Sequence, residues 1–323
     1  MDAPRVRLRQ KQRSATSPRI GDNIIDARSL SHGWSIWILQ WVVIWLGVAA
    51  LLVIGARLWG QTVPSNGQIA YVTKSGISAQ VHVIDVYTRT DHLITDLIDV
   101  DQIAWSPDKA LAFTVRHGET SRIMVIDLQR HTLRQLTNSA GFATNPSWSP
   151  DGMWLAFQSN NASGADIFVA DSIGDSLRRL SSDAAFDGDP SWSPDSKQLV
   201  FRSSRSGNSD LYVMDLDGNI VRQLTDSVAR EEHPSWSPDG KYIAFASHNW
   251  DIYLLEVATG AIHQLTQSPA RDRYPTWSPD STHIAFESNR DGQVGIYAID
   301  LATGHVAPIA KRNEGSYSPI WKP

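Results

Sequence analysis

The feature that most constrains this chain is a short phrase built on tryptophan, which recurs at nearly constant intervals. Five copies read Trp-Ser-Pro-Asp, and a shorter sixth copy reads Trp-Lys-Pro. The successive tryptophans lie 43, 44, 44, 41 and 44 residues apart. A period in the forties is typical of one supersecondary unit that is copied and stacked. The repeated tryptophans are Trp105, Trp148, Trp192, Trp236, Trp277 and Trp321.

Apolar runs accompany each copy of the phrase. One copy contains Leu199-Val-Phe201, then Leu211-Tyr-Val-Met-Asp215, then the more polar Val221-Arg-Gln-Leu-Thr225. Runs of this length, rich in Val, Ile, Phe and Tyr and bounded by Gly, Asn, Asp and Ser, are typical of strands. No window after residue 60 has the length and spacing of a helix. With the tryptophan strand, each repeat supplies four short antiparallel strands, which predicts one blade of a β-propeller.

The phrase itself has a mechanical interpretation. Proline presets a backbone angle of a tight turn, and aspartate bonds to its own backbone there, so Ser-Pro-Asp-Gly predicts the hairpin between the first and second strands. The tryptophan before the turn is large enough to fill the space between neighbouring blades. A motif that every repeat contains is therefore expected to be structural rather than a binding site.

The repeats predict six blades closed by an exchanged strand. The first repeat has a second strand at Ile69-Ala-Tyr71 but no tryptophan strand before it, while Tyr317-Ser-Pro-Ile-Trp321 has no later strands. The two fragments complete each other, and closure removes exposed sheet edges. We expect an all-β, six-bladed propeller over residues 67–323, preceded by one transmembrane helix.

A membrane segment is predicted near the N-terminus. Residues 34–56 contain no charge, and about 20 apolar residues suffice to span a bilayer. Residues 1–33 carry seven Arg or Lys and three Asp, which favours a cytoplasmic tail and an extracytoplasmic propeller. A cleaved signal peptide is the alternative, although its apolar region is usually about 7–15 residues. The expected parts are a tail at 1–33, a helix at 34–58 and a linker at 59–66.

Composition excludes several classes of function. The chain carries a net charge of −5 although its tail is basic, which argues against nucleic acid as a partner. It has no cysteine, so no disulfide and no lipid anchored through cysteine is expected.

No nucleophile elbow, metalloprotease motif, phosphate loop or dinucleotide fingerprint is found, so no catalytic residue, no metal ligand and no cofactor is assigned.

The repeats differ most in the loops that lead into the tryptophan strands, which should open toward the axis of the ring. Acidic residues are abundant there, and three readings stay open: a solvated rim, a site for a protein or peptide that is basic in character, and a Ca²⁺ site in the channel. The candidate binding residues are Asp187, Asp189, Glu231, Glu232, His233, Asp272, Arg273, Tyr274 and Tyr317.

The repeat resembles a known family. Its fullest copy runs Ser203-Ser-Arg205-Ser-Gly207-Asn-Ser-Asp-Leu-Tyr-Val-Met-Asp215, after Pro-x-Trp-Ser-Pro-Asp. This pattern is similar to that of the TolB-like propellers, which include a protein-interaction component of the Tol–Pal envelope system. Similar repeats also form the propellers that gate prolyl-oligopeptidase-type peptidases. In this chain a hydrophobic segment stands where the Tol protein has an α/β domain.

The resemblance and the residues together predict a single-pass protein of the cell membrane. Its propeller would act outside the membrane as a binding or scaffold module for a protein or peptide. The alternative is a propeller enzyme, or the gating subunit of an envelope hydrolase, with carboxylates of the funnel as its site. A histidine and a glutamate such as His233 and Glu231 or Glu232, directed at one pocket, would favour that alternative.

Overall fold

The computed structural model describes residues 67–75, 78–108, 110–118, 120–130, 132–137, 142–161, 164–311 and 315–323. Within the described ranges every element is a β-strand, and no helix there is long and apolar enough to cross a membrane. The predicted tail, helix and linker lie outside the described residues.

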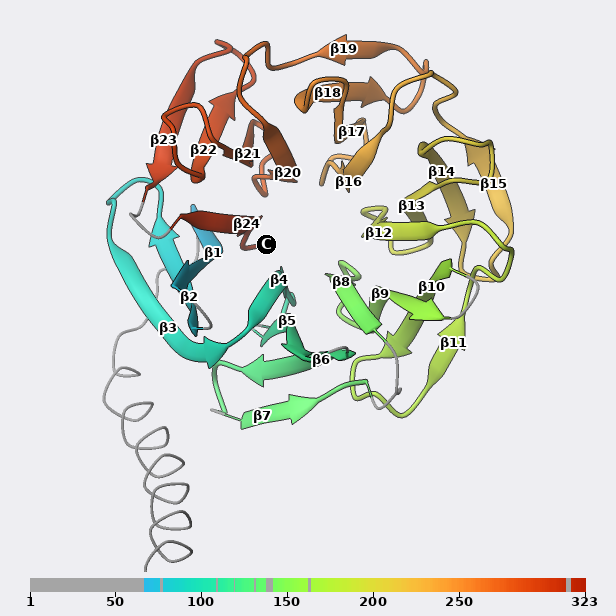
Figure 1. Ribbon diagram of the computed structural model, residues 1–323, viewed down its shortest axis with the longest axis horizontal. Coiled ribbons are helices and arrows are strands. Elements are labelled where there is room, and N and C mark those ends of the chain that lie inside the picture. The colour runs from blue at the N-terminus through green and yellow to red at the C-terminus, as the bar shows by residue number, and fades with distance from the viewer. Residues whose placement is uncertain are drawn as a thin grey trace, which may run out of the picture. The chain divides into compact units, whose positions relative to one another are not determined.

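The strands are arranged in units of four around a central axis (Figure 1). The innermost strands are β4 (Val100–Trp105), β8 (Phe142–Trp148), β12 (Asp187–Trp192), β16 (Glu232–Trp236), β20 (Asp272–Trp277) and β24 (Ser316–Trp321). The second strands are β1 (Gln68–Ser75), β5 (Ala110–His117), β9 (Trp154–Asn161), β13 (Gln198–Ser203), β17 (Tyr242–Ser247) and β21 (His283–Ser288).

The outer half of each unit is formed by two more strands. The third strands are β2 (Ser78–Asp85), β6 (Thr120–Asp127), β10 (Gly164–Asp171), β14 (Asp210–Asp215), β18 (Asp251–Glu256) and β22 (Gly295–Asp300). The outermost strands are β3 (Asp91–Ile98), β7 (Thr132–Gln135), β11 (Leu177–Arg179), β15 (Ile220–Gln223), β19 (Ile262–Gln264) and β23 (Val306–Ala310). Neighbours within a unit pair antiparallel, and a single parallel pair, Ser121 with Phe142, joins two units into one sheet.

The all-β architecture predicted from the sequence is confirmed, and so is the exchanged strand. β24 pairs antiparallel with β1, with Trp321 opposite Ile69 and Tyr317 opposite Val72. The sheet order β24-β1-β2-β3 therefore joins the last described strand to the first three. This pairing gives β1 a neighbour on the side of the axis and removes an open edge.

The tryptophans pack between neighbouring units. Five of them are buried and Trp236 is half-buried. Trp192 and Trp277 donate their indole N–H groups to the carbonyl oxygens of Ser147 and Ser235 in the preceding innermost strands, at 2.9 Å in each case. These two bonds help to hold adjacent units in register, whereas the indole N–H groups of Trp105, Trp148 and Trp321 have no hydrogen-bond partner among the described residues.

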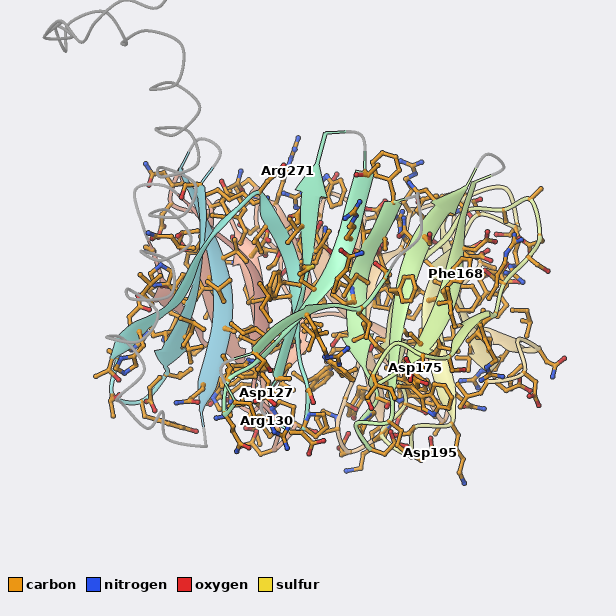
Figure 2. The ribbon with its side chains drawn as sticks, turned by 90° about the horizontal axis from the view of Figure 1, so that it is seen from below. Asp127, Arg130, Phe168, Asp175, Asp195 and Arg271 are labelled. Carbon is orange, nitrogen blue, oxygen red and sulfur yellow. The ribbon has the colours of Figure 1, made fainter. Side chains whose placement is uncertain are left out.

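The Ser-Pro-Asp turns form as predicted. In the turn after β8, Ser149 donates its hydroxyl to Asp151 at 2.6 Å, and the Asp151 carboxylate accepts the backbone N–H of Met153 at 2.9 Å. The turns after β12, β16 and β20 repeat this pattern. Figure 2 shows Asp195, from one of these turns, on the opposite edge of the disc from Arg271. The turns and the loops that lead into the innermost strands thus occupy opposite faces.

Candidate functional site

The loops that lead into the innermost strands contribute three equivalent positions in each unit. The first position packs against the hairpin between the second and third strands, the second lies beside the second strand, and the third faces the axis. The residues concerned are 100–102, 143–145, 187–189, 231–233, 272–274 and 316–318.

An irregularity in strand pairing turns the third position toward the axis. β12 pairs with β13 as far as Gly188 and resumes at Ser191, so Asp189 and Pro190 share one partner position. Comparable shifts occur in β4, β8, β16, β20 and β24. A bulge of this kind redirects a side chain. Because it recurs around the axis, side chains from every unit converge on one place.

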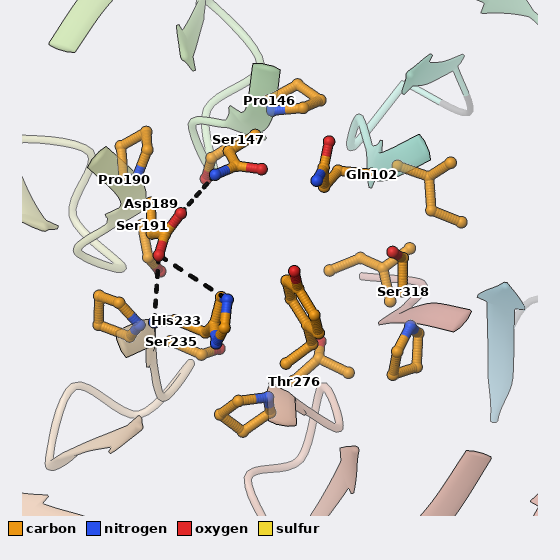
Figure 3. Close-up of a pocket in the computed structure, with 17 residues that line it drawn as sticks. Gln102, Pro146, Ser147, Asp189, Pro190, Ser191, His233, Ser235, Thr276 and Ser318 are labelled. Atoms are coloured by element: carbon orange, nitrogen blue, oxygen red, sulfur yellow. Dashed lines mark hydrogen bonds and ion pairs between the residues drawn. The ribbon is translucent and has the colours of Figure 1, made fainter. Parts of the chain in front are cut away.

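The converging side chains line a pocket on the axis (Figure 3), which we call the axial pocket. It encloses about 650 Å³, part of it open to solvent. Its third-position residues are Gln102, Asn145, Asp189, His233, Tyr274 and Ser318, and the prolines in its wall are Pro146, Pro190, Pro234, Pro275 and Pro319. A rigid wall with a few polar groups is typical of a site that binds a side chain or a short segment.

Asp189 is the centre of a polar network on one side of the axial pocket. Its carboxylate pairs with Arg202 Nε at 2.7 Å, accepts a hydrogen bond from the amide of Asn145, and accepts the backbone N–H of His233 at 3.3 Å. Arg202 also reaches Glu232 at 3.3 Å. These contacts join three consecutive units, so they fix the shape of the pocket as well as its charge.

Next to Asp189, the wall of the axial pocket is aromatic. The rings of His233 and Tyr274 lie 3.8 Å apart between centroids, and the Arg273 guanidinium lies 5.9 Å from the Tyr274 ring. Burial lowers the pKa of His233, although Asp189 and Glu232 oppose this, and burial raises the pKa of the Tyr274 phenol. At neutral pH both rings are therefore uncharged, and the aromatic side offers flat apolar surface.

Glu287 of β21 supports the loop before β24. It is 3 % exposed and accepts the backbone N–H of Ser318 at 2.6 Å, while Arg273 lies 4.0 Å away. Burial raises the pKa of Glu287 to about 7, and this outweighs the hydrogen bond and the attraction of Arg273. The residue is thus partly protonated near neutral pH.

Of the three readings left open by the sequence, a solvated acidic rim does not fit the three first-position acids. Asp187 and Asp272 are 0 % exposed and Glu231 is 2 % exposed. Arg205 and Arg290, in the hairpins behind them, pair with Asp187 at 3.0 Å and with Asp272 at 2.9 Å. These acids are internal because the first position points into the unit rather than toward solvent, so their role in binding stays a prediction.

The second-position residues lie at the edge of the axial pocket. Glu232, Arg273 and Tyr317 are half-buried. Tyr317 does not line the pocket and instead lies beneath the ammonium of Lys74, 5.9 Å from its ring centroid. Asp101 pairs with Lys74 at 3.1 Å. Of the nine predicted binding residues, the structure therefore brings Asp189, His233 and Tyr274 together in one pocket.

The carboxylates do not converge as a cation site would require. Among the residues that the structure describes, no three His, Asp or Glu side chains gather as metal ligands do. His233 Nε2 lies 4.0 Å from Asp189, which is too long for a hydrogen bond, and His233 Nδ1 has no hydrogen-bond partner. Glu232 faces Arg202 and Glu231 is internal, so neither is directed with His233 at one pocket, the arrangement that would favour an enzyme.

Sequence reasoning missed the arginines and part of the pocket. Arg202 was not singled out, and the arginine of Ser-x-Arg-x-Gly was read only as part of a repeat. Asn145 and Ser318, which line the axial pocket, are not among the predicted binding residues. A signal for the pocket residues is present in the sequence: in five of the units, the residue that lines the pocket comes directly before a proline.

Comparison with known families identifies the fold. The model of the TolB β-propeller domain matches residues 59–188, 182–250 and 246–323. The chain belongs to this family. The resemblance predicted from the sequence is thus confirmed for this TolB-family propeller.

Solved structures of low sequence identity share the fold. TolB from Acinetobacter baumannii superposes with a TM-score of 0.72 at 22 % identity, over 85 % of this chain and 72 % of that one. Putative TolB from Agrobacterium tumefaciens gives 0.66 at 22 % identity, over 76 % and 92 %. An oligogalacturonate lyase in complex with manganese gives 0.52 at 16 % identity, over 74 % and 78 %.

Proposed function

We propose that this chain is a membrane-anchored scaffold whose propeller binds a segment of a protein or peptide at the axial pocket. The observation that carries the proposal is the pocket itself. The third positions differ from unit to unit, as Asp189, His233 and Tyr274 illustrate, while the strands and turns around them repeat. Variation at a convergent point of a rigid scaffold is where binding specificity usually resides.

The chemistry of the axial pocket suits a peptide with mixed side chains. Its wall presents the carboxylate of Asp189, balanced by Arg202, and also the ring of Tyr274. Five prolines provide rigid apolar walls. Membership of the TolB family supports a protein partner, because the resemblance implies a protein-interaction module. The basic character predicted for the partner belongs to this proposal.

The proposal includes a closed ring and a membrane anchor. The four-strand units would be the six blades of a propeller that the β24–β1 pair closes. The uncharged segment 34–56 would span the cell membrane, and the basic tail would keep the N-terminus in the cytoplasm. The propeller would then bind its partner on the extracytoplasmic side.

A capture experiment tests the binding site. The full-length chain, solubilised in mild detergent, is used to capture proteins from membranes of the same cells, and the captured proteins are compared by mass spectrometry. Tyr274→Ala should lose the partner, whereas Lys197→Ala, an exposed residue beside Asp195 on the opposite face, should retain it. Equal capture by the two variants would contradict the proposal, provided that both melt as the wild type does.

A further inference from the structure

The unit that contains β12–β15 holds an arginine in a cage of its own residues. Arg205, in the hairpin between β13 and β14, donates from Nη2 to both carboxylate oxygens of Asp187 at 3.1 and 3.0 Å and from Nε to Ser203 Oγ at 2.8 Å. Its guanidinium lies 5.5 Å from the ring of Phe201 and 5.0 Å from that of Tyr212. We call this set of carboxylate, serine, phenylalanine and tyrosine the arginine cage.

The unit that contains β20–β23 repeats the arginine cage. Arg290 donates to Asp272 at 2.9 Å and to Ser288 Oγ at 2.9 Å. Its guanidinium lies 5.2 Å from the ring of Phe286 and 4.9 Å from that of Tyr297. Two units therefore use the same four groups to hold a guanidinium, which combines charge-assisted hydrogen bonds with stacking on aromatic faces.

The unit between them keeps the cage but lacks the arginine. Glu231 occupies the carboxylate position, and Ser247 Oγ lies 3.5 Å from Glu231 Oε1. Phe245 and Tyr253 stack with centroids 5.8 Å apart, and the corresponding ring centroids in the sister units lie 6.1 and 6.3 Å apart. The hairpin between β17 and β18, however, has only residues 248–250, whereas the sister hairpins have six residues. The three residues are His, Asn and Trp.

The missing arginine leaves an aromatic face uncovered. Tyr253 is half-buried, while Tyr212 and Tyr297 are 4 % and 2 % exposed beneath their arginines. Because this hairpin is three residues shorter than its counterparts, the interval between Trp236 and Trp277 is 41 residues, the one short interval in the repeat.

Two buried carboxyl groups beside the incomplete cage also lack a cation. Glu231 contacts only hydroxyl groups and the carboxyl of Asp210, and the hydroxyls of Ser227 and Thr225 lie at 2.5 and 3.2 Å. Asp210 is 1 % exposed, and its Oδ1 has no hydrogen-bond partner among the described residues. In the part of the chain that the structure describes, no Lys, Arg or His forms an ion pair with either group. Burial, with a contribution from Asp210, raises the pKa of Glu231.

A pocket opens beside this incomplete cage. It encloses about 530 Å³, part of it open to solvent, and its wall includes Ser247, Asn249 and Trp250. A second hollow at the same hairpin is lined by Tyr253 and again by Trp250. The serine and the tyrosine of the cage can therefore be approached from solvent. Arg230, which also lines the first pocket, is exposed and is not paired with Glu231.

We propose that this incomplete cage receives an arginine side chain of the bound partner. The inference rests on the proposed function, because the arginine would belong to the segment that occupies the axial pocket. Its guanidinium would donate to Glu231 and Ser247 and stack on Tyr253, as Arg205 does within its own unit. Lysine fits less well, because a point charge cannot donate along two directions in one plane and stack as well.

The incomplete cage adjoins the axial pocket. Glu232 lines the pocket beside the cage, and the next residue, His233, lines the axial pocket. The Arg273 guanidinium lies 5.4 Å from the Trp250 ring and 5.9 Å from the Tyr274 ring, so it connects the two sites. A single extended peptide can therefore reach both.

A small guanidinium compound tests the cage separately from any partner. N-acetyl-arginine-N-methylamide is titrated into the full-length chain in detergent, with the indole signal of Trp250 followed by ¹⁹F NMR after 5-fluorotryptophan labelling and assigned with Trp250→Phe. We expect a saturable shift with a Kd on the order of 1 mM, and binding of the uncharged citrulline analogue about tenfold weaker. Equal shifts from the two compounds would overturn the proposal.

Two variants and a matched control complete the test. Glu231→Gln should weaken binding of the arginine amide about tenfold, whereas Asp183→Asn, the same change of charge at a half-exposed residue of the neighbouring unit, should leave it unchanged. Replacing residues 248–250 by the six-residue sequence of 289–294 supplies an internal arginine. That graft should raise the melting temperature and abolish binding of the amide; a graft that binds it as the wild type does would refute the proposal.

The outcomes separate this inference from the proposed function. If the graft loses the amide but still captures the partner through Tyr274, the partner does not use the cage, and only the present inference fails. If the amide binds as expected while Tyr274→Ala retains every captured protein, the cage binds guanidinium and the axial pocket is not the partner site.

Discussion

At the scale of single residues, the axial pocket depends on an uncommon backbone conformation. Five residues that precede proline there have positive φ angles between 49° and 54°; they are Asn145, Asp189, His233, Tyr274 and Ser318. Residues other than glycine rarely adopt this region, at a cost of about 1–3 kcal/mol each. Such strain is usual where a scaffold must direct side chains to one point.

The internal arginine cages are expected to be important for stability. Arg205→Met should lower the free energy of unfolding by about 3–5 kcal/mol, because it leaves the buried carboxylate of Asp187 unpaired. The double variant Arg205→Met/Asp187→Asn should recover a large part of this loss, since the uncompensated charge is gone. Urea denaturation measures both. If Arg205→Met lowered the free energy of unfolding by less than the double variant does, the unpaired carboxylate of Asp187 would not be the cause of the loss.

Glu287 predicts a dependence of stability on pH. Its pKa is raised from 4.5 to about 7 in the folded chain, so between these values the unfolded state releases the proton while the folded state keeps it. Stability therefore falls as pH rises from about 4.5 to about 7, and below that window the residue contributes nothing. Glu287→Gln should be more stable than the wild type at pH 8 by up to about 3 kcal/mol, and equally stable near pH 4.5. Urea denaturation at both pH values would contradict this if the two proteins differed by a constant amount.

At the scale of elements, the sequence was informative where a pattern repeats. The tryptophan phrase, the apolar triplets and the incomplete first repeat together predicted the strands and the pairing of β24 with β1. The direction of the loop side chains was not predictable in this way. A bulge shifts the pairing by one residue, and a shift of one turns a side chain to the other face of a strand.

The buried acids are a second case in which the sequence pattern does not show which residues are in contact. Asp187 and Asp272 have their arginines eighteen residues later, at Arg205 and Arg290, in a hairpin that the sequence presents only as a polar stretch. Eighteen residues after Glu231 stands Asn249. The short interval in the repeat is visible in the sequence. That it leaves Glu231 without an arginine becomes clear only from the structure, in which the hairpin of the sister units folds back onto the acid.

The exchanged strand gives a prediction about stability. Trp321 of β24 is 6 % exposed and packs with Tyr71 and Ile296. Trp321→Ala should cost about 3–5 kcal/mol, and truncation before β24 should cost more because β1 also loses its inner neighbour. Differential scanning calorimetry of the two variants against Trp59→Ala, a change outside the repeats, measures this. Unchanged melting after truncation would place the closure elsewhere.

At the scale of the whole molecule, the charge of the sequence predicts an orientation in the proposed membrane. The basic tail and the uncharged segment 34–56 predict a cytoplasmic N-terminus and an extracytoplasmic propeller. Protease added to intact cells or right-side-out spheroplasts should digest the propeller and spare a tag at residue 1. A propeller that is protected until the membrane is broken would reverse this orientation, and a soluble propeller of native size would indicate a cleaved signal peptide.

The central claim is that a partner occupies the axial pocket, and cross-linking in living cells tests it most directly. A photoreactive amino acid is placed at Ser318, which lines the pocket, or at Lys197, which is exposed on the opposite face. Illumination should yield a discrete cross-linked partner from position 318, which Tyr274→Ala removes, and none from position 197. The same partner from both positions, or a partner from position 197 alone, would contradict the account.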